Sequence, residues 1–187
     1  MSLHISFELS QSDLDYFCEV MRRARDNAKD KPCQQIIESA EQLLAQINRS
    51  GATDFIRDRM GQLEVLIAML EDNGWGLIED DRERVLTALS YFSEPEDLIP
   101  DDIPGLGFLD DAIMVEIVCK ELEPEILAYR DFVVFRTTEA GRRGEEAPVM
   151  QRSDWLEERR QQLHSRMRRR RKDSTRTNRT KSPFSLL

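Results

Sequence analysis

The sequence lacks any apolar run of about 18 residues, the length needed to cross a bilayer, so no transmembrane segment is expected. Its N-terminal stretch has no basic segment followed by an apolar one, and we therefore expect no secretory signal. Cysteine is scarce: Cys18, Cys33 and Cys119 are odd in number and isolated within helical patterns. This usage is typical of reduced, packed thiols rather than of a disulfide framework. Together these absences predict a cytoplasmic protein.

Histidine is also scarce, and the glycines form no phosphate-binding loop. His4 and His164 are the two histidines, and neither has the neighbouring cysteine or acidic pattern of a zinc site or a catalytic triad. Gly105 and Gly107 flank one leucine, but no Gly-Lys-Ser/Thr sequence follows them. These patterns assign no catalytic residue and no organic cofactor. A non-enzymatic protein is therefore the preferred expectation, and catalysis by a pair of carboxylates is the alternative.

Charge is what the chain has in quantity, and it is unevenly distributed. Of the 187 residues, 34% are charged and 40% are hydrophobic, which fits one domain with a packed core and a polar surface. The net charge is −9, yet residues 151–187 contain 12 Lys/Arg and 4 Asp/Glu, a net of +8. Residues 1–150 therefore carry −17. The chain is expected to fold as an acidic body with a basic C-terminal segment.

Apolar residues recur at helical spacing through most of the chain, and capping residues or Pro/Gly pairs separate the segments. This pattern predicts an all-α fold: one bundle-like domain of about six helices over residues 1–136. Residues 137–152 are predicted to be a linker, and residues 153–187 a semi-independent basic helix that gives way after Lys172 to a disordered tail. Residues 3–9 alternate apolar and polar positions and are expected to form a packed extended arm.

The segment from Leu89 to Leu122 contains the most apolar helix pattern of the chain, preceded by an acidic bend rich in proline and glycine. From Asp111 onward the apolar residues cover nearly the whole circumference of a helix, which predicts a helix buried on most sides. Pro104-Gly105 fits the middle of a type II turn, and Asp110 or Asp111 is placed to cap the buried helix. The indole of Trp75 is expected to pack under this bend.

The bend carries a recognisable motif: residues Asp97 to Ala112 read D-L-I-P-D-D-I-P-G-L-G-F-L-D-D-A. This stretch closely resembles the core motif of the YkvA-like family, a bacterial domain of unknown function (DUF1232). The resemblance extends over about residues 85–122, and the flanking segments match only in being helical. Members of the family are often hydrophobic enough to be considered membrane-associated, a property that this polar chain does not share. The resemblance implies no activity, cofactor or catalytic residue.

Five carboxylates of the bend are candidate metal ligands: Asp97, Asp101, Asp102, Asp110 and Asp111. Oxygen ligands gathered on a tight bend could hold Mg²⁺ or Ca²⁺, although their spacing is not that of an EF-hand loop. The simpler interpretation is that these aspartates accept hydrogen bonds from free N–H groups at turns and helix starts. We prefer the capping interpretation and keep the metal site as the alternative.

The basic segment offers six candidate residues for binding an anionic partner: Arg166, Arg168, Arg169, Arg170, Arg171 and Lys172. Such a cluster can neutralise the phosphates of RNA or DNA, and it can also attract anionic lipid headgroups. A third interpretation is that the segment lies on the protein's own acidic body or stays solvated. The preferred function is a non-enzymatic interaction or scaffold protein whose basic segment engages an anionic or protein partner. A divalent-metal-binding, hydrolytic protein and a peripheral protein at anionic membranes are the alternatives.

Overall fold

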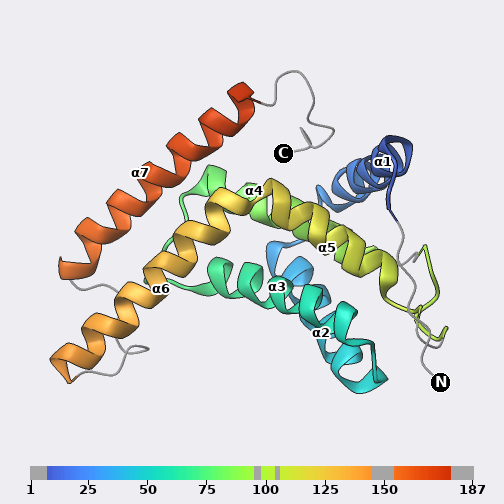
Figure 1. Cartoon of the computed structure of the whole chain (residues 1–187), viewed down its shortest axis with the longest axis horizontal. Coiled ribbons are helices and arrows are strands. Elements are labelled where there is room, and N and C mark those ends of the chain that lie inside the picture. Colours follow the sequence, from blue (N-terminus) through green and yellow to red (C-terminus); the bar gives the residue numbers. More distant parts are fainter. Residues whose placement is uncertain (1–7, 95–97, 104–105, 145–153, 178–187) are drawn as a thin grey trace.

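The computed structural model describes residues 8–94, 98–103, 106–144 and 154–177, and over these ranges the chain is all-α, as predicted (Figure 1). The described residues form seven α-helices and one 3-10 helix and contain no strand: α1 Gln11–Ala28, α2 Cys33–Ser50, α3 Asp54–Glu71, α4 Glu79–Leu89, η1 Ser90–Ser93, α5 Leu109–Glu121, α6 Glu123–Arg143 and α7 Asp154–Thr177. None of these described helices is both long enough and apolar enough to span a membrane.

Local capping residues explain where the first helices begin and end. The Ser10 hydroxyl accepts a hydrogen bond from the Asp13 amide, and the Asp13 carboxylate accepts one from the Ser10 amide, which completes a capping box at α1. The Thr53 hydroxyl caps α3 in the same way, by accepting from the Ile56 amide. Gly51 follows α2 with a φ of 66°, a left-handed conformation that glycine adopts without a Cβ clash.

Helix α5 lies in the core, as the sequence predicts. Its buried apolar residues are Ala112, Met114, Val115, Ile117 and Val118, and Leu122 directly after the helix is also fully buried. Figure 1 shows α5 in the middle of the view beside α3, with α6 continuing from its C-terminal end. Each large apolar side chain removed from water contributes roughly 1.5–3 kcal/mol, so α5 is a major source of stability.

Helices α6 and α7 are both longer than predicted. Helix α6 continues to Arg143, where Gly144 ends it in a left-handed conformation, so the prediction of a linker is wrong for residues 137–143. The buried side chain of Ala140 stabilises this last part of α6 despite the glycine at position 141. Helix α7 continues to Thr177, so the disorder predicted after Lys172 is wrong for residues 173–177. Adding a residue to an existing helix costs little, which explains the extension.

Helix α7 is packed against α6 (Figure 1). The prediction that it would be semi-independent of the body is therefore wrong. Its side chains Leu156, Leu163 and Met167 are buried. The fully buried indole of Trp75 lies between the two helices rather than under the acidic bend. Its ring centroid is 5.2 Å from that of Phe132 in α6 and 4.0 Å from that of His164 in α7.

Asp72 anchors the turn that carries Trp75. Its carboxylate accepts hydrogen bonds from the Gly74 and Trp75 amides and from both terminal nitrogens of Arg136, at 2.7–3.1 Å. Burial alone would raise the pKa of Asp72, but the bonds from Arg136 and the Trp75 amide outweigh it and hold the pKa below its ordinary value. The turn is thus attached to α6 by a charged pair as well as by the indole.

Candidate functional site

The acidic bend is a series of tight turns that ends directly at α5. The Ile103 amide donates to the Pro100 carbonyl at 3.1 Å, and the Gly107 amide donates to the Ile103 carbonyl at 2.8 Å. Phe108, which precedes α5, has a φ of 66°. A left-handed phenylalanine costs about 1–2 kcal/mol, and burial of its ring offsets that cost. The bend is therefore set by backbone contacts and by one buried ring.

Gly107 is required by a close approach within the bend. A Cβ atom added at this position would lie 2.2 Å from the carbonyl oxygen of Asp101, which is part of the backbone and cannot rotate away. Gly107 has no left-handed φ, so space rather than conformational freedom demands glycine here. This contact gives a physical reason for the second glycine of the motif.

Substituting Gly107 with alanine should therefore lower the free energy of unfolding by about 1–3 kcal/mol, the range seen when atoms are forced into a packed site. Gly61 provides the matched control, because a Cβ there meets nothing within 4 Å and the residue lies inside α3. Gly61→Ala should be stabilising by roughly 0.5–1 kcal/mol. Urea unfolding followed by circular dichroism measures both effects. Equal effects of the two substitutions would contradict the close approach.

Asp110 holds the bend from its buried side. The residue is 2% exposed, and its carboxylate accepts hydrogen bonds from the Leu98 amide at 2.9 Å and the Ile99 amide at 3.2 Å. The Tyr91 hydroxyl lies 3.5 Å from the same oxygen. The prediction that Asp110 or Asp111 caps α5 needs correction, since the N-cap is Phe108 and both aspartates lie in the first turn. There they still favour the helix dipole.

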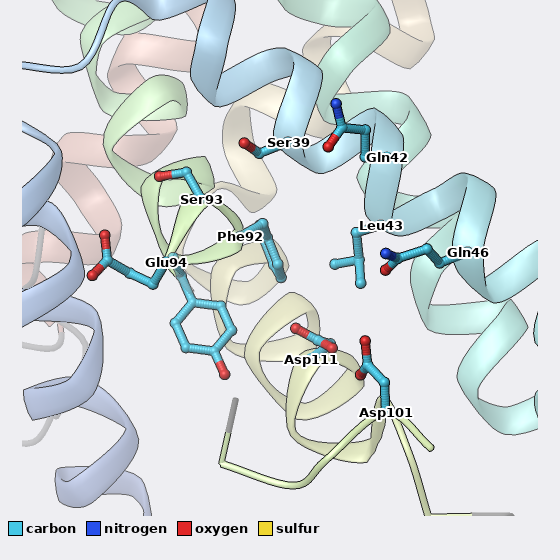
Figure 2. Close-up of a pocket in the computed structure, with 10 residues that line it drawn as sticks. Ser39, Gln42, Leu43, Gln46, Phe92, Ser93, Glu94, Asp101 and Asp111 are labelled. Carbon is cyan, nitrogen blue, oxygen red and sulfur yellow. The ribbon is translucent and has the colours of Figure 1, made fainter. Parts of the chain in front are cut away.

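Asp101 and Asp111 line a polar cleft between the bend and α2. Figure 2 shows the Asp101 carboxyl group pointing toward α2, where Leu43 and Gln46 line the same cleft. The cleft has a volume of about 260 Å³, and its lining also includes Ser39, Gln42, Tyr91, Phe92, Ser93 and Glu94. Polar side chains from α2, η1 and the bend thus converge on one hollow.

The structure does not gather the five predicted metal ligands into one site. Asp101 and Asp111 share the cleft, Asp110 accepts hydrogen bonds from the backbone of the bend, and Asp102 is exposed. Asp97 lies outside the described residues. Across the part of the chain that is described, no group of three or more His, Cys, Asp or Glu is arranged to hold a metal ion. The observed contacts of Asp110 are those of a structural residue.

The basic segment of α7 is divided between two faces. On the inner face, Arg171 contacts Asp81 at 2.6 Å and Glu125 at 3.1 Å, and Arg168 lies 4.0 Å from Asp81. On the outer face, Arg169 and Lys172 are exposed, and Arg170 is half-buried at the edge of the docked face, three residues after Met167. These three form no ion pair with any residue that the structure describes. Arg166 lies between the two faces, 3.7 Å from Asp131.

Asp81 and Glu125 are functional candidates that the sequence analysis did not single out. Both side chains are 0% exposed, and the Arg84 side chain approaches Glu125 at 3.4 Å. The two carboxylates raise the pKa of Arg171, although its burial alone would lower it. A signal was present in the sequence: Asp81 precedes Val85 by four residues, and Glu125 precedes Tyr129 by four. Each acid therefore occupies a position on the buried stripe of its helix.

The fold and the bend define an all-α protein organised around a proline- and aspartate-rich turn. Residues 84–117 match the model of the family described as "Protein of unknown function (DUF1232)". This match confirms the resemblance to the DUF1232 family that the motif at Asp97 to Ala112 indicated. The matched residues span the end of α4, η1, the bend and most of α5. Comparisons with curated proteins and with solved structures found no match to the chain.

Proposed function

We propose that the protein is a non-enzymatic helical interaction module that engages an anionic partner through the outer face of α7. One observation carries this proposal: the inner arginines attach the helix to the body, while the exposed Arg169 and Lys172 and the half-buried Arg170 have no ion-pair partner among the described residues. A docked helix presents its charges in a fixed arrangement, and its residues lose less conformational freedom on binding than a disordered segment would.

The spacing of the outer cations fits a phosphate backbone. Arg169 and Lys172 are three residues apart, so they share one ridge of the helix. Arg166, which is exposed and contacts Asp131, lies on the same ridge three residues before Arg169. Phosphate contacts require positive charge within reach and no particular base sequence. The outer residues carry no aromatic rings, so stacking on bases is not expected. A single-stranded or double-stranded nucleic acid is the preferred partner.

The acidic body opposes this binding and sets its strength. Residues 1–150 carry a net charge of −17, and this charge repels a polyanion at distances comparable to the Debye length. We therefore expect a weak, sequence-independent interaction with a Kd of about 10⁻⁶–10⁻⁴ M that declines steeply as salt is added.

The test is fluorescence anisotropy of a labelled single-stranded RNA titrated with the full chain. The variant Arg169→Gln/Arg170→Gln/Lys172→Gln should weaken binding at least about tenfold and reduce the salt slope by about 2, at roughly 0.7 per lost phosphate contact. The control Arg23→Gln/Lys29→Gln/Arg142→Gln removes three exposed cations, one in α1, one directly after α1 and one in α6, and should bind like the wild type. Equal loss in the two triple variants, or no binding by the wild type, would contradict the proposal.

Flotation with vesicles separates the membrane alternative from the nucleic-acid one. If α7 recognises phosphates along a nucleic acid, the fraction of protein bound to vesicles of neutral and anionic phospholipid should be smaller than the fraction bound to RNA at the same salt concentration. Flotation that is lost in the outer triple variant, without RNA binding by the wild type, would favour the peripheral membrane protein.

A further inference from the structure

Two helices of the body bury acidic side chains directly beneath α7. Asp81 belongs to α4 and Glu125 to α6, and neither side chain is exposed. Arg171 contacts both, and Arg168 approaches Asp81. A buried carboxylate is costly unless a positive charge compensates it. Helix α7 therefore supplies compensating charge to acids that other helices hold in place.

The apolar contact that seats α7 is narrow. Within residues 156–173, the part of α7 whose side chains the structure describes, three apolar side chains are buried: Leu156, Leu163 and Met167. His164 adds a ring stacked on Trp75, and the Arg160 guanidinium lies 3.3 Å from the Trp75 carbonyl. Docking thus depends strongly on charged and polar contacts, which are the kind that salt and polyanions compete with.

We propose that α7 is an autoinhibitory helix: Asp81 and Glu125 hold Arg168 and Arg171 away from the anionic partner, and release of the helix makes them available. The docked helix offers the partner the outer cations alone. The released helix offers five consecutive cations over residues 168–172. This inference rests on the proposed function, because it concerns the regulation of the same basic segment.

The geometry explains why the two states differ in affinity. In the docked helix, the Arg171 guanidinium is engaged by two carboxylates, and a phosphate would have to displace both. A polyanion that contacts all five cations binds the released helix more tightly than the docked helix. The difference between these two binding free energies is the amount by which the polyanion stabilises the released state. Binding and release are therefore coupled, and weakening the acids should strengthen binding.

The test uses the full-length variant Asp81→Asn/Glu125→Gln, which removes the two negative charges that pair with Arg171. Limited trypsin digestion should cut faster after the arginines of residues 166–171. RNA affinity should rise about tenfold, and the salt slope should steepen by about 1.4 for two additional phosphate contacts. Far-ultraviolet circular dichroism verifies that the helices remain folded. If the double variant does not fold, the single variant Glu125→Gln, which leaves Asp81 to pair with Arg171, should show a smaller gain in the same direction.

The matched control is Asp80→Asn/Glu123→Gln, which removes two exposed acids next to the buried ones and changes the net charge equally. It should leave trypsin cleavage unchanged and raise RNA affinity less than the buried-acid variant does. Unchanged trypsin cleavage in the buried-acid variant, or equal affinity gains in the two variants, would overturn the autoinhibition.

If wild type binds RNA through the outer cations and the buried-acid variant shows no gain, the inference alone fails. If the wild type does not bind and the buried-acid variant does, autoinhibition stands and the outer-face function fails.

Discussion

Substituting Trp75 with alanine should lower the free energy of unfolding by about 3–5 kcal/mol, the cost of deleting a large buried aromatic side chain. The indole is fully buried, and its ring packs against Tyr129 and Phe132 of α6 and against His164 of α7. Its loss removes the shared contact between three parts of the chain. Urea unfolding followed by circular dichroism measures this change.

Phenylalanine is the conservative control at the same position. The Trp75 indole N–H donates no hydrogen bond to a described residue, so Trp75→Phe loses ring area without leaving a polar partner unsatisfied. It should cost clearly less than the alanine substitution. A small effect of Trp75→Ala, comparable with that of an exposed residue, would show that the contact between α6 and α7 does not depend on this side chain.

Asp110→Ala should lower the free energy of unfolding by about 3–6 kcal/mol, because hydrogen bonds to a charged group contribute about 1.5–3 kcal/mol each and two are lost. The carboxylate connects the first turn of α5 to the Leu98 and Ile99 amides, on the opposite side of the bend. Its removal should loosen the bend and the start of α5 together. Chemical denaturation at neutral pH is the measurement.

Asp102→Ala is the control for this prediction, since Asp102 is exposed and surface substitutions usually stay within about 0.5 kcal/mol. The metal-binding alternative predicts a different pattern. If the bend held Mg²⁺, Ca²⁺ or Mn²⁺, each ion that bound would raise the melting temperature of the wild type, and Asp111→Asn would abolish the rise. We expect no rise, because the described carboxylates of the bend do not form a ligand group.

Local signals made much of the fold predictable. Ser10, Thr53 and Gly51 occupy helix boundaries because capping depends on a few neighbouring residues. The burial of α5 was predictable for a different reason: its apolar side chains leave it no polar face to turn toward water. The motif at Asp97 to Ala112 identified the family because its residues are contiguous in the sequence.

Features that depend on contacts between distant segments were not predictable. The sequence places Trp75 after α3. Its hydrogen bond with His164 of α7 joins residues that are 89 positions apart in the chain. The close approach of Gly107 to Asp101 depends on the path of the bend, and its composition indicates only that a turn occurs. Asp81 and Glu125 lie on the buried stripes of their helices, but the sequence does not show that α7 supplies the arginine that contacts them.

The division of the basic segment shows the same limit for the candidate site. The arginine cluster was evident from the sequence, whereas the direction of each arginine depends on which helix face packs on the body. Arg171 lies on the same face as Leu163 and Met167, eight and four residues earlier, so the docked face was implicit in the spacing. What the spacing could not supply was the acidic surface under that face.

Helix α5 forms the core, and α7 is docked on α6 and α4 but is separable from them. Amide hydrogen exchange of the full-length chain, followed by mass spectrometry, tests both parts in one measurement. Amides of α5 over residues 114–118 should exchange only through global unfolding, while α7 should be protected yet open at a lower free energy, and that opening should become easier as salt increases. Exchange of α5 that is faster than that of α1, or exchange of α7 at the rate of an unstructured peptide, would contradict the account.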